Sequence, residues 1–148
     1  MKNFILVGIA SFIFVGCAGS GFKTYGEYIS ATESSTYSDV IVYRPSGFVG
    51  GGTIFTVTLN GIELGKLGSK EFLIGEMQEG RNSLEVKVGG LQGLGINKPS
   101  QTFEKTTDGN TYFKVSYTYD SINSLGPVNL KIVIQEISLN QFRALAAS

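Results

Sequence analysis

The chain has 148 residues, enough for one domain with a hydrophobic core, and carries 12 basic and 12 acidic residues. This balance, without any run of lysine or arginine, predicts that nucleic acid is not a partner. The chain contains no histidine, which excludes Ser-His and Cys-His nucleophile pairs and the side chain most often used as a general base near neutral pH.

The chain starts with a positive residue and an apolar stretch over residues 4–15, followed by Gly16 and Cys17, the only cysteine. This pattern indicates a secretory signal, because a membrane-spanning helix needs roughly 20 apolar residues. A small residue directly before cysteine resembles the bacterial lipoprotein lipobox, with Phe14 in place of the usual leucine. The resemblance implies cleavage before Cys17 and lipid on its thiol and new amine. We expect a signal peptide at residues 1–16; the alternative is an ordinary signal or anchor with an incidental cysteine.

Residues 17–36 are predicted to form the lipidated cysteine and a flexible tether, because they are rich in glycine, serine and threonine. A free coil of this length would hold the domain about 25 Å from the lipid. Tyr25, Tyr28 and Ile29 interrupt the polar composition, so part of the segment can lie against the domain. Ala18 after the cysteine is similar to lipoproteins sorted to the outer membrane, which predicts a cell-envelope location facing the periplasm.

Residues 37–148 are predicted to form one all-β domain. Runs of alternating or continuous apolar residues between turn signals predict strands at residues 39–43, 53–59, 62–67, 71–77, 83–88, 101–107, 111–119 and 128–136. Asn60 followed by Gly61 predicts a tight hairpin, since both residues accept positive φ. The expected architecture is a small antiparallel β-sandwich or open barrel of about seven or eight strands.

Two features near the C-terminus extend this prediction. Ser138 and Gln141 form a capping box ahead of apolar residues at helical spacing, which predicts a short C-terminal helix packed on the sheet. In the strand at residues 111–119, Tyr117 and Tyr119 share a side with two apolar residues and are expected in the core. Tyr112 lies on the opposite side, where it packs against the rest of the domain or, alternatively, stacks on a sugar.

Four segments resemble a family of bacterial lipoproteins that share a domain of unknown function, DUF2846. They are residues 43–50 (YRPSGFVG), 57–67 (VTLNGIELGKL), 71–76 (EFLIGE) and 107–115 (TDGNTYFKV). The resemblance extends over residues 39–136 and departs from the family at Gln78 and Glu79, where prolines are usual, and in the longer loop at residues 89–99. It implies a β-rich lipoprotein domain and supplies no catalytic residues.

We predict no catalytic, cofactor-binding or metal-binding residues. The three aspartates are far apart in sequence, whereas calcium sites need clustered acids. Glu71 and Glu76 have odd spacing on one predicted strand and therefore point to opposite faces. Residues 90–95 have the glycines of a dinucleotide-binding loop in the wrong order, and no helix or lysine follows them.

Contact with a partner is the more favoured use of this chain. Arg44 is expected to end its strand and pair with a nearby acid or carbonyl; alternatively it binds an anion or a partner. If consecutive strands are antiparallel, the loops after the first, third, fifth and seventh strands emerge together, on the side away from the tether. Their large apolar residues, which either dock another envelope protein or fold back over the open end of the sandwich, are Phe48, Val49, Leu91, Leu94, Ile96, Ile122 and Leu125.

We therefore expect a lipoprotein anchored in the membrane through Cys17, whose domain is a non-catalytic binding or structural module of the bacterial envelope. One alternative is a module that binds glycan or peptidoglycan, which needs exposed aromatic side chains on one face. The other is an envelope hydrolase, which needs acidic residues that converge in a cleft.

Overall fold

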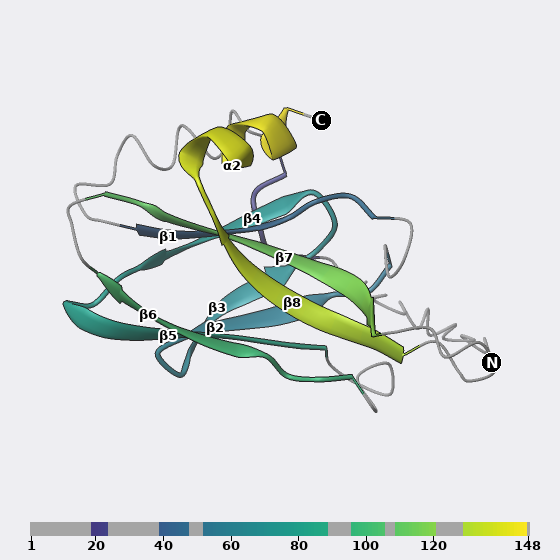
Figure 1. The fold of residues 1–148 in the computed structure, drawn as a ribbon, viewed down its shortest axis with the longest axis horizontal. Helices are drawn as coiled ribbons and strands as arrows, with labels where there is room; N and C mark the ends of the chain where they lie inside the picture. The colour runs from purple at the N-terminus through teal and green to yellow at the C-terminus, as the bar shows by residue number, and fades with distance from the viewer. Residues whose placement is uncertain are drawn as a thin grey trace, which may run out of the picture.

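The computed structural model describes residues 19–23, 39–47, 52–88, 96–105, 109–120 and 129–147. These residues form two four-stranded sheets that face one another, and a short helix lies against the outer face of one sheet (Figure 1). The first sheet has the strand order β4-β1-β7-β8, and the second has the order β3-β2-β5-β6. The predicted all-β sandwich is confirmed, and its sheets are not closed into a barrel.

Each predicted strand is present, and the differences are confined to strand ends. The first sheet contains β1 (Asp39–Arg44), β4 (Glu71–Glu76), β7 (Thr111–Asp120) and β8 (Asn129–Ile137). The second contains β2 (Phe55–Leu59), β3 (Ile62–Leu67), β5 (Gly80–Val88) and β6 (Ser100–Lys105). β2 and β3 meet at Asn60 and Gly61, whose φ values of 53° and 79° match the predicted hairpin.

The odd-numbered strands all end on the same side of the sandwich. β1 is parallel to β7, and every other pairing is antiparallel. The two sheets meet where the Lys70 amide, in the turn after β3, donates to the Arg44 carbonyl oxygen at 2.8 Å. We call this side the turn end, after residues 68–70, and the opposite side the hairpin end, after Asn60 and Gly61.

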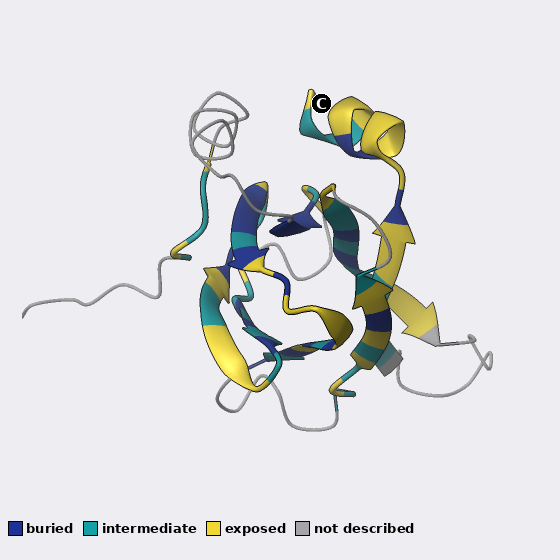
Figure 2. Ribbon diagram, turned by 90° about the vertical axis from the view of Figure 1, so that its left-hand side faces the viewer, coloured by how far each residue is buried: buried dark blue, intermediate teal, exposed yellow. Residues whose placement is uncertain are grey.

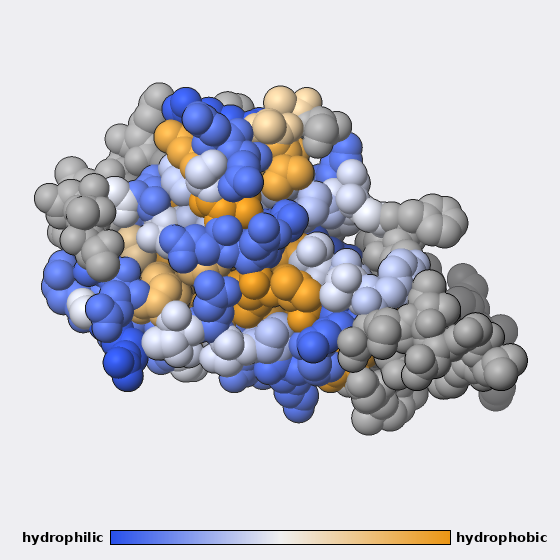
Figure 3. All heavy atoms as spheres, viewed as in Figure 1, coloured by the Kyte–Doolittle hydropathy of each residue, from blue (hydrophilic) through white to orange (hydrophobic). Residues whose placement is uncertain are grey.

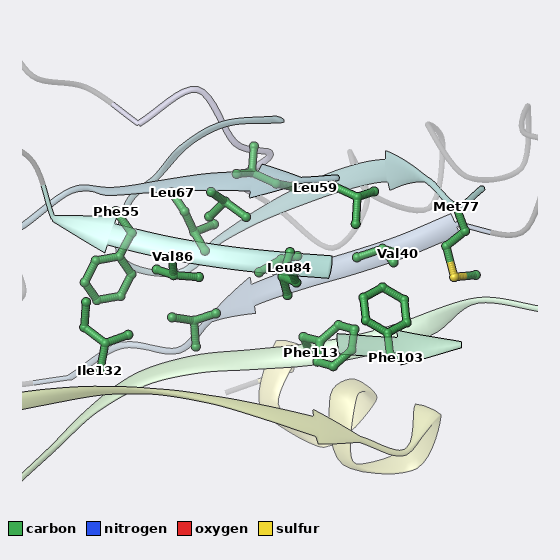
Figure 4. Packing of buried hydrophobic residues seen from close by; sticks show 14 of the residues in the cluster. Val40, Phe55, Leu59, Leu67, Met77, Leu84, Val86, Phe103, Phe113 and Ile132 are labelled. Carbon is green, nitrogen blue, oxygen red and sulfur yellow. The ribbon is translucent and has the colours of Figure 1, made fainter. Parts of the chain in front are cut away.

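The core lies between the two sheets, where alternate residues of each strand point inward. Val40 and Phe113 from the first sheet face Leu84 and Val86 from the second, and all four are fully buried (Figure 4). β1 is buried at all six positions because both of its faces are covered. Figure 2 shows this burial as a dark strand in the middle of the fold. A continuous apolar run without alternation is therefore what this position requires.

The helix α2 (Leu139–Ala146) covers the outer face of the first sheet. Its predicted capping box is present, with the Gln141 amide donating to Ser138 Oγ at 3.3 Å and the Ser138 amide donating to Gln141 Oε1 at 2.9 Å. Phe142 is buried against Tyr43 and Phe72, and its ring centroid lies 4.8 Å from that of Tyr112. Tyr112 thus packs under the helix rather than facing solvent.

Tyr119 is the position at which the predicted core is wrong. β7 runs past the end of β1, because the last residue of β7 paired with β1 is Lys114, opposite Tyr43. Beyond that point β8 is the one strand among the described residues that pairs with β7, and Tyr119 at this projecting end is 51% exposed. Tyr117 still packs on the core, with its ring centroid 5.1 Å from that of Phe55.

Tyr43 provides a test of this packing. Its hydroxyl donates to the Leu145 carbonyl oxygen at 3.0 Å, and burial raises the pKa of the phenol above its ordinary value of 10.0. A raised folded-state pKa means that the stabilisation is complete below pH 10 and is lost as pH rises through the folded pKa. Tyr43→Phe is expected to cost about 1 kcal/mol at neutral pH and to reduce the alkaline loss of stability. Urea unfolding across this pH range measures both effects.

Tyr119→Phe, at an exposed position, is the control for Tyr43→Phe. If the free energy of unfolding fell equally steeply with alkaline pH in Tyr43→Phe and in wild type, the role assigned to the buried Tyr43 hydroxyl would be contradicted.

Candidate functional site

A groove with a volume of about 690 Å³ lies at the hairpin end. It lies where the edge strands β3 and β4 of the two sheets diverge toward the β2–β3 hairpin. We call it the hairpin-end groove. It is lined by Leu59, Asn60, Ile62, Leu64, Glu76, Met77, Gln78, Glu79 and Lys105.

A β-bulge in β3 places Leu64 in this groove. Val57 pairs with Gly65 while the next residue, Thr58, pairs with Glu63, so Leu64 is the extra residue. Gly65 has a φ of 149°, which a residue with a side chain rarely adopts. The redirected Leu64 lies directly over Gly75, where an added Cβ would be 2.7 Å from Leu64 Cδ2. A bulge on one edge strand and a glycine on the other thus shape the wall of the groove.

The groove combines an apolar wall with a charged rim. Ile62 begins β3 and is 65% exposed, the most exposed large apolar side chain among the described residues. Leu59 and Met77 are buried beneath it. On the rim, Lys105 Nζ lies 2.6 Å from Glu79 Oε1, and the Glu79 side chain is 87% exposed. Ile62 and Leu64 thus give the groove an apolar wall that is partly open to solvent.

Asn82 holds the two turns that frame the groove. This side chain is 1% exposed and receives hydrogen bonds from Asn60 Nδ2 at 2.9 Å and from the Gln78 amide at 3.0 Å. Its own Nδ2 donates to the carbonyl oxygens of Gln78 and Gly80 at 2.9 and 3.0 Å. Asn82 could not be singled out from the sequence, because an asparagine two residues after Gly80 signals a nearby turn but not which two turns its side chain joins.

Arg44 is the predicted contact residue that the structure describes most fully, and it is buried at 4% exposure. Its guanidinium donates to the carbonyl oxygens of Thr53 and Leu67 and lies 4.2 Å from the centre of the Phe55 ring. Burial lowers the pKa of the guanidinium, while the charges of Tyr117 and Glu71 oppose that shift. These contacts favour the expected structural role at the end of β1 over contact with a partner.

A second groove, of about 250 Å³, lies at the turn end. It contains the exposed Tyr119 ring together with several hydroxyl-bearing side chains. It is lined by Pro45, Ser46, Gly47, Ser116, Tyr117, Thr118, Tyr119 and Leu130.

The edge of the sandwich formed by β3 and β4 is bridged by residues 19–23, which we call the edge segment. The Ser20 amide donates to the Lys66 carbonyl oxygen at 2.7 Å, and the Lys66 amide donates to Ser20 Oγ at 2.8 Å. Phe22 and Phe72 exchange two backbone hydrogen bonds, of 2.8 and 2.9 Å. This part of the predicted tether is therefore held on the domain, whereas Tyr25, Tyr28 and Ile29 lie outside the described residues.

Two glycines allow the edge segment to approach so closely. A Cβ at Gly19 would overlap the carboxylate of Glu71, and a Cβ at Gly21 would lie 2.5 Å from the Phe72 carbonyl oxygen. Glu71 is buried and accepts a hydrogen bond from the Gly68 amide at 2.7 Å. Glycine is usual both in flexible linkers and at close backbone contacts, so composition alone did not distinguish these uses.

The opposite edge, between β6 and β8, is bridged by one side chain. Asn97 Nδ2 donates to the Ile132 carbonyl oxygen at 2.9 Å, and the Ile132 amide donates to Asn97 Oδ1 at 2.6 Å. Hydrophobic atoms are visible between the two layers on the face seen in Figure 3, surrounded by hydrophilic ones. The neighbouring Ile96, a predicted contact residue, is partly buried against the main core. Of the two predicted roles of Ile96, this position favours the one in which its side chain folds back and covers the open end of the sandwich, rather than docking a partner.

The remaining predicted residues cannot be placed in either groove. The lipidation residue Cys17 and the loop residues Phe48, Val49, Leu91 and Leu94 lie outside the described residues, as do Ile122 and Leu125. Within the described ranges, no group of three or more acidic or cysteine side chains is arranged to hold a metal ion. No helix in that part of the chain is long and apolar enough to cross a bilayer.

Two of the residues that line the hairpin-end groove carry carboxylates, Glu76 and Glu79. Glu79 lies on the open rim and bonds to Lys105. Comparison of the chain with protein-family models, with curated proteins and with solved structures found no match.

Proposed function

We propose that the chain is a bacterial envelope lipoprotein, anchored through lipid on Cys17, whose DUF2846-like sandwich acts by binding another envelope protein. The hairpin-end groove is the contact surface, and the observation that carries this choice is Ile62, 65% exposed above an apolar wall. Exposed isoleucine costs free energy in water, and a partner that covers it recovers that cost. The partner presents an apolar side chain flanked by charge, because the rim offers Glu79 and Lys105.

The anchor is tested first. In a diderm bacterium that expresses the intact chain, the mature protein is expected to begin at Cys17, to carry the mass of acyl chains and to fractionate with membranes. Cys17→Ser is expected to lose the acyl mass and the membrane fractionation. A wild-type protein with a free Cys17 thiol, or one that keeps residues 1–16, would contradict the proposal.

The contact surface is tested by photocrosslinking in the same cells. A photoreactive residue at position 62 is expected to form one discrete protein adduct, which mass spectrometry identifies. The same residue at position 131, an exposed β8 position toward the turn end, is the matched control. Adducts that are identical from both positions, or that persist when Leu64→Asp is added, would reject the groove as the contact surface.

A glycan-binding module is the second candidate, and Tyr119 favours it. Its ring is half exposed in the turn-end groove among hydroxyl groups, an arrangement that suits stacking on a sugar ring. Tyr119→Ala is expected to abolish retention of the protein on soluble peptidoglycan fragments if this candidate is correct. Retention that is absent in wild type, or equal in the variant, would remove it.

A further inference from the structure

We infer that the domain rests on the membrane with the turn end of its β3–β4 edge toward the lipid, an inference that rests on the proposed lipid at Cys17. The observation is the edge segment. Ser20 is fixed to Lys66 by two hydrogen bonds, and Phe22 is fixed to Phe72 by two more. A chain attached so soon after Cys17 cannot act as a long tether on its lipid side.

Covalent geometry sets the distance from the lipid to the domain. Cys17 lies three positions before Ser20, and a fully extended chain covers at most about 3.6 Å per residue, or about 11 Å in total. Since paired backbones lie about 5 Å apart, the acylated residue can be no more than about 16 Å from Lys66 on the β3–β4 edge. A free coil from residue 17 to residue 36 would instead allow the domain to tumble in any orientation.

The charge distribution of the domain agrees with this orientation. Lys23 belongs to the edge segment, Lys66 pairs with it, and Lys70 lies in the adjacent turn; all three are exposed. Lys87 lies across Thr56 from Lys66, and Lys131 pairs with Thr118 beyond the end of β1. The glutamates toward the hairpin end include Glu63, Glu76, Glu79, Glu85 and Glu104, and Arg81 and Lys105 offset part of their charge. At the turn end, Glu71 is buried.

Anionic phospholipid headgroups are the surface that fits this pattern. A lysine near an anionic leaflet makes the free energy of membrane binding more favourable, and this electrostatic attraction falls off within a Debye length of the surface. Lysines at the turn end lie within that range once the lipid on Cys17 enters the bilayer, whereas the glutamates of the hairpin end face away. Covalent attachment and charge thus select the same orientation.

This orientation changes which surfaces a partner can reach. β1, β3, β5 and β7 all end at the turn end, so this end of the sandwich lies on the membrane side and is not the distal rim that the sequence suggested. The hairpin-end groove lies at the other end of β3, with Ile62 four residues before Lys66. It therefore opens toward the aqueous compartment, where an envelope partner can reach it.

The test uses the intact lipoprotein, reconstituted into vesicles of phosphatidylglycerol and phosphatidylethanolamine. Acylated Cys17 has no free thiol, so an introduced cysteine can be labelled alone with a fluorophore. Lys66→Cys and Glu104→Cys place the label on the outer face of the same sheet, toward the turn end and the hairpin end respectively. A nitroxide on the lipid headgroup is expected to quench the label at position 66 several times more strongly than the label at position 104.

Gly21→Val is the variant that releases the edge segment, because its Cβ would meet the Phe72 carbonyl oxygen. It is expected to equalise quenching at positions 66 and 104, whereas Gly52→Val, with nothing within 4 Å of its Cβ, is expected to preserve the difference. Circular dichroism confirms that both variants are folded. Equal quenching in the parent protein, or a preserved difference in Gly21→Val, would overturn the inference. Labelling of a protein without an introduced cysteine would instead refute acylation of Cys17.

Discussion

Replacing Arg44 with alanine is expected to lower the free energy of unfolding by about 3–5 kcal/mol, the usual cost of removing one member of a buried charged network. The guanidinium bonds to two carbonyl oxygens and lies on the Phe55 ring. On the neighbouring strand the residue opposite Arg44 is the buried Glu71, whose charge acts on the guanidinium. Alanine leaves these carbonyls without their donor and the carboxylate without a compensating charge. Urea unfolding, followed by circular dichroism, measures the loss.

Two further variants identify the cause. Arg81→Ala removes an exposed arginine from β5 and is expected to change stability by less than about 0.5 kcal/mol. Glu71→Gln, added to Arg44→Met, is expected to recover part of the loss of Arg44→Met alone, because a neutral amide needs no cation nearby. If the double variant loses the full sum of both single losses, electrostatic coupling between the two positions is absent.

Asn82→Ala is expected to cost about 2–4 kcal/mol, because it leaves several buried backbone and side-chain groups without partners. Its amide joins the β2–β3 hairpin to the turn before β5 through Asn60, Gln78 and Gly80. Because these turns frame the hairpin-end groove, the variant is also expected to weaken crosslinking from position 62.

The control for Asn82 is Gln78→Ala, which removes an exposed amide from the same turn and keeps its backbone hydrogen bonds. Its free energy of unfolding is expected to stay within about 0.5 kcal/mol of wild type. Equal losses in the two variants would show that the turn is sensitive to any substitution, and that Asn82 has no special role in joining the β2–β3 hairpin to the turn before β5.

Local sequence patterns predicted the elements of this fold because each depends on neighbours in the chain. Asn60 and Gly61 accept positive φ, Ser138 caps with Gln141, and β1 is apolar at successive positions because the second sheet and α2 cover its two faces. A helix packed on the outer face of the first sheet brings its apolar residues against outward-facing side chains of β7, which accounts for the contact between Phe142 and Tyr112.

The features that shape the grooves depend on contacts distant in sequence, which periodicity does not report. The Leu64 bulge depends on the register of β2, and Asn82 joins two turns that lie far apart in the chain. Tyr119 has the alternation of a core residue, but exposure depends on where the neighbouring strand stops. Gly19 and Gly21 have the composition of a linker, although Glu71 and Phe72 leave no room for a side chain.

The position of β1 has a consequence for the order of assembly. β2, β3, β5 and β6 pair only with one another and lie within residues 55–105, interrupted by β4 of the other sheet, so their sheet can form as soon as β6 is available. β1 is the earliest strand, yet its parallel partner is β7, with Val40 opposite Thr111. Contacts over such sequence separations close late and slowly. Until β7 joins, β1 pairs only with β4 and its other edge is open, so the first sheet is completed after the second.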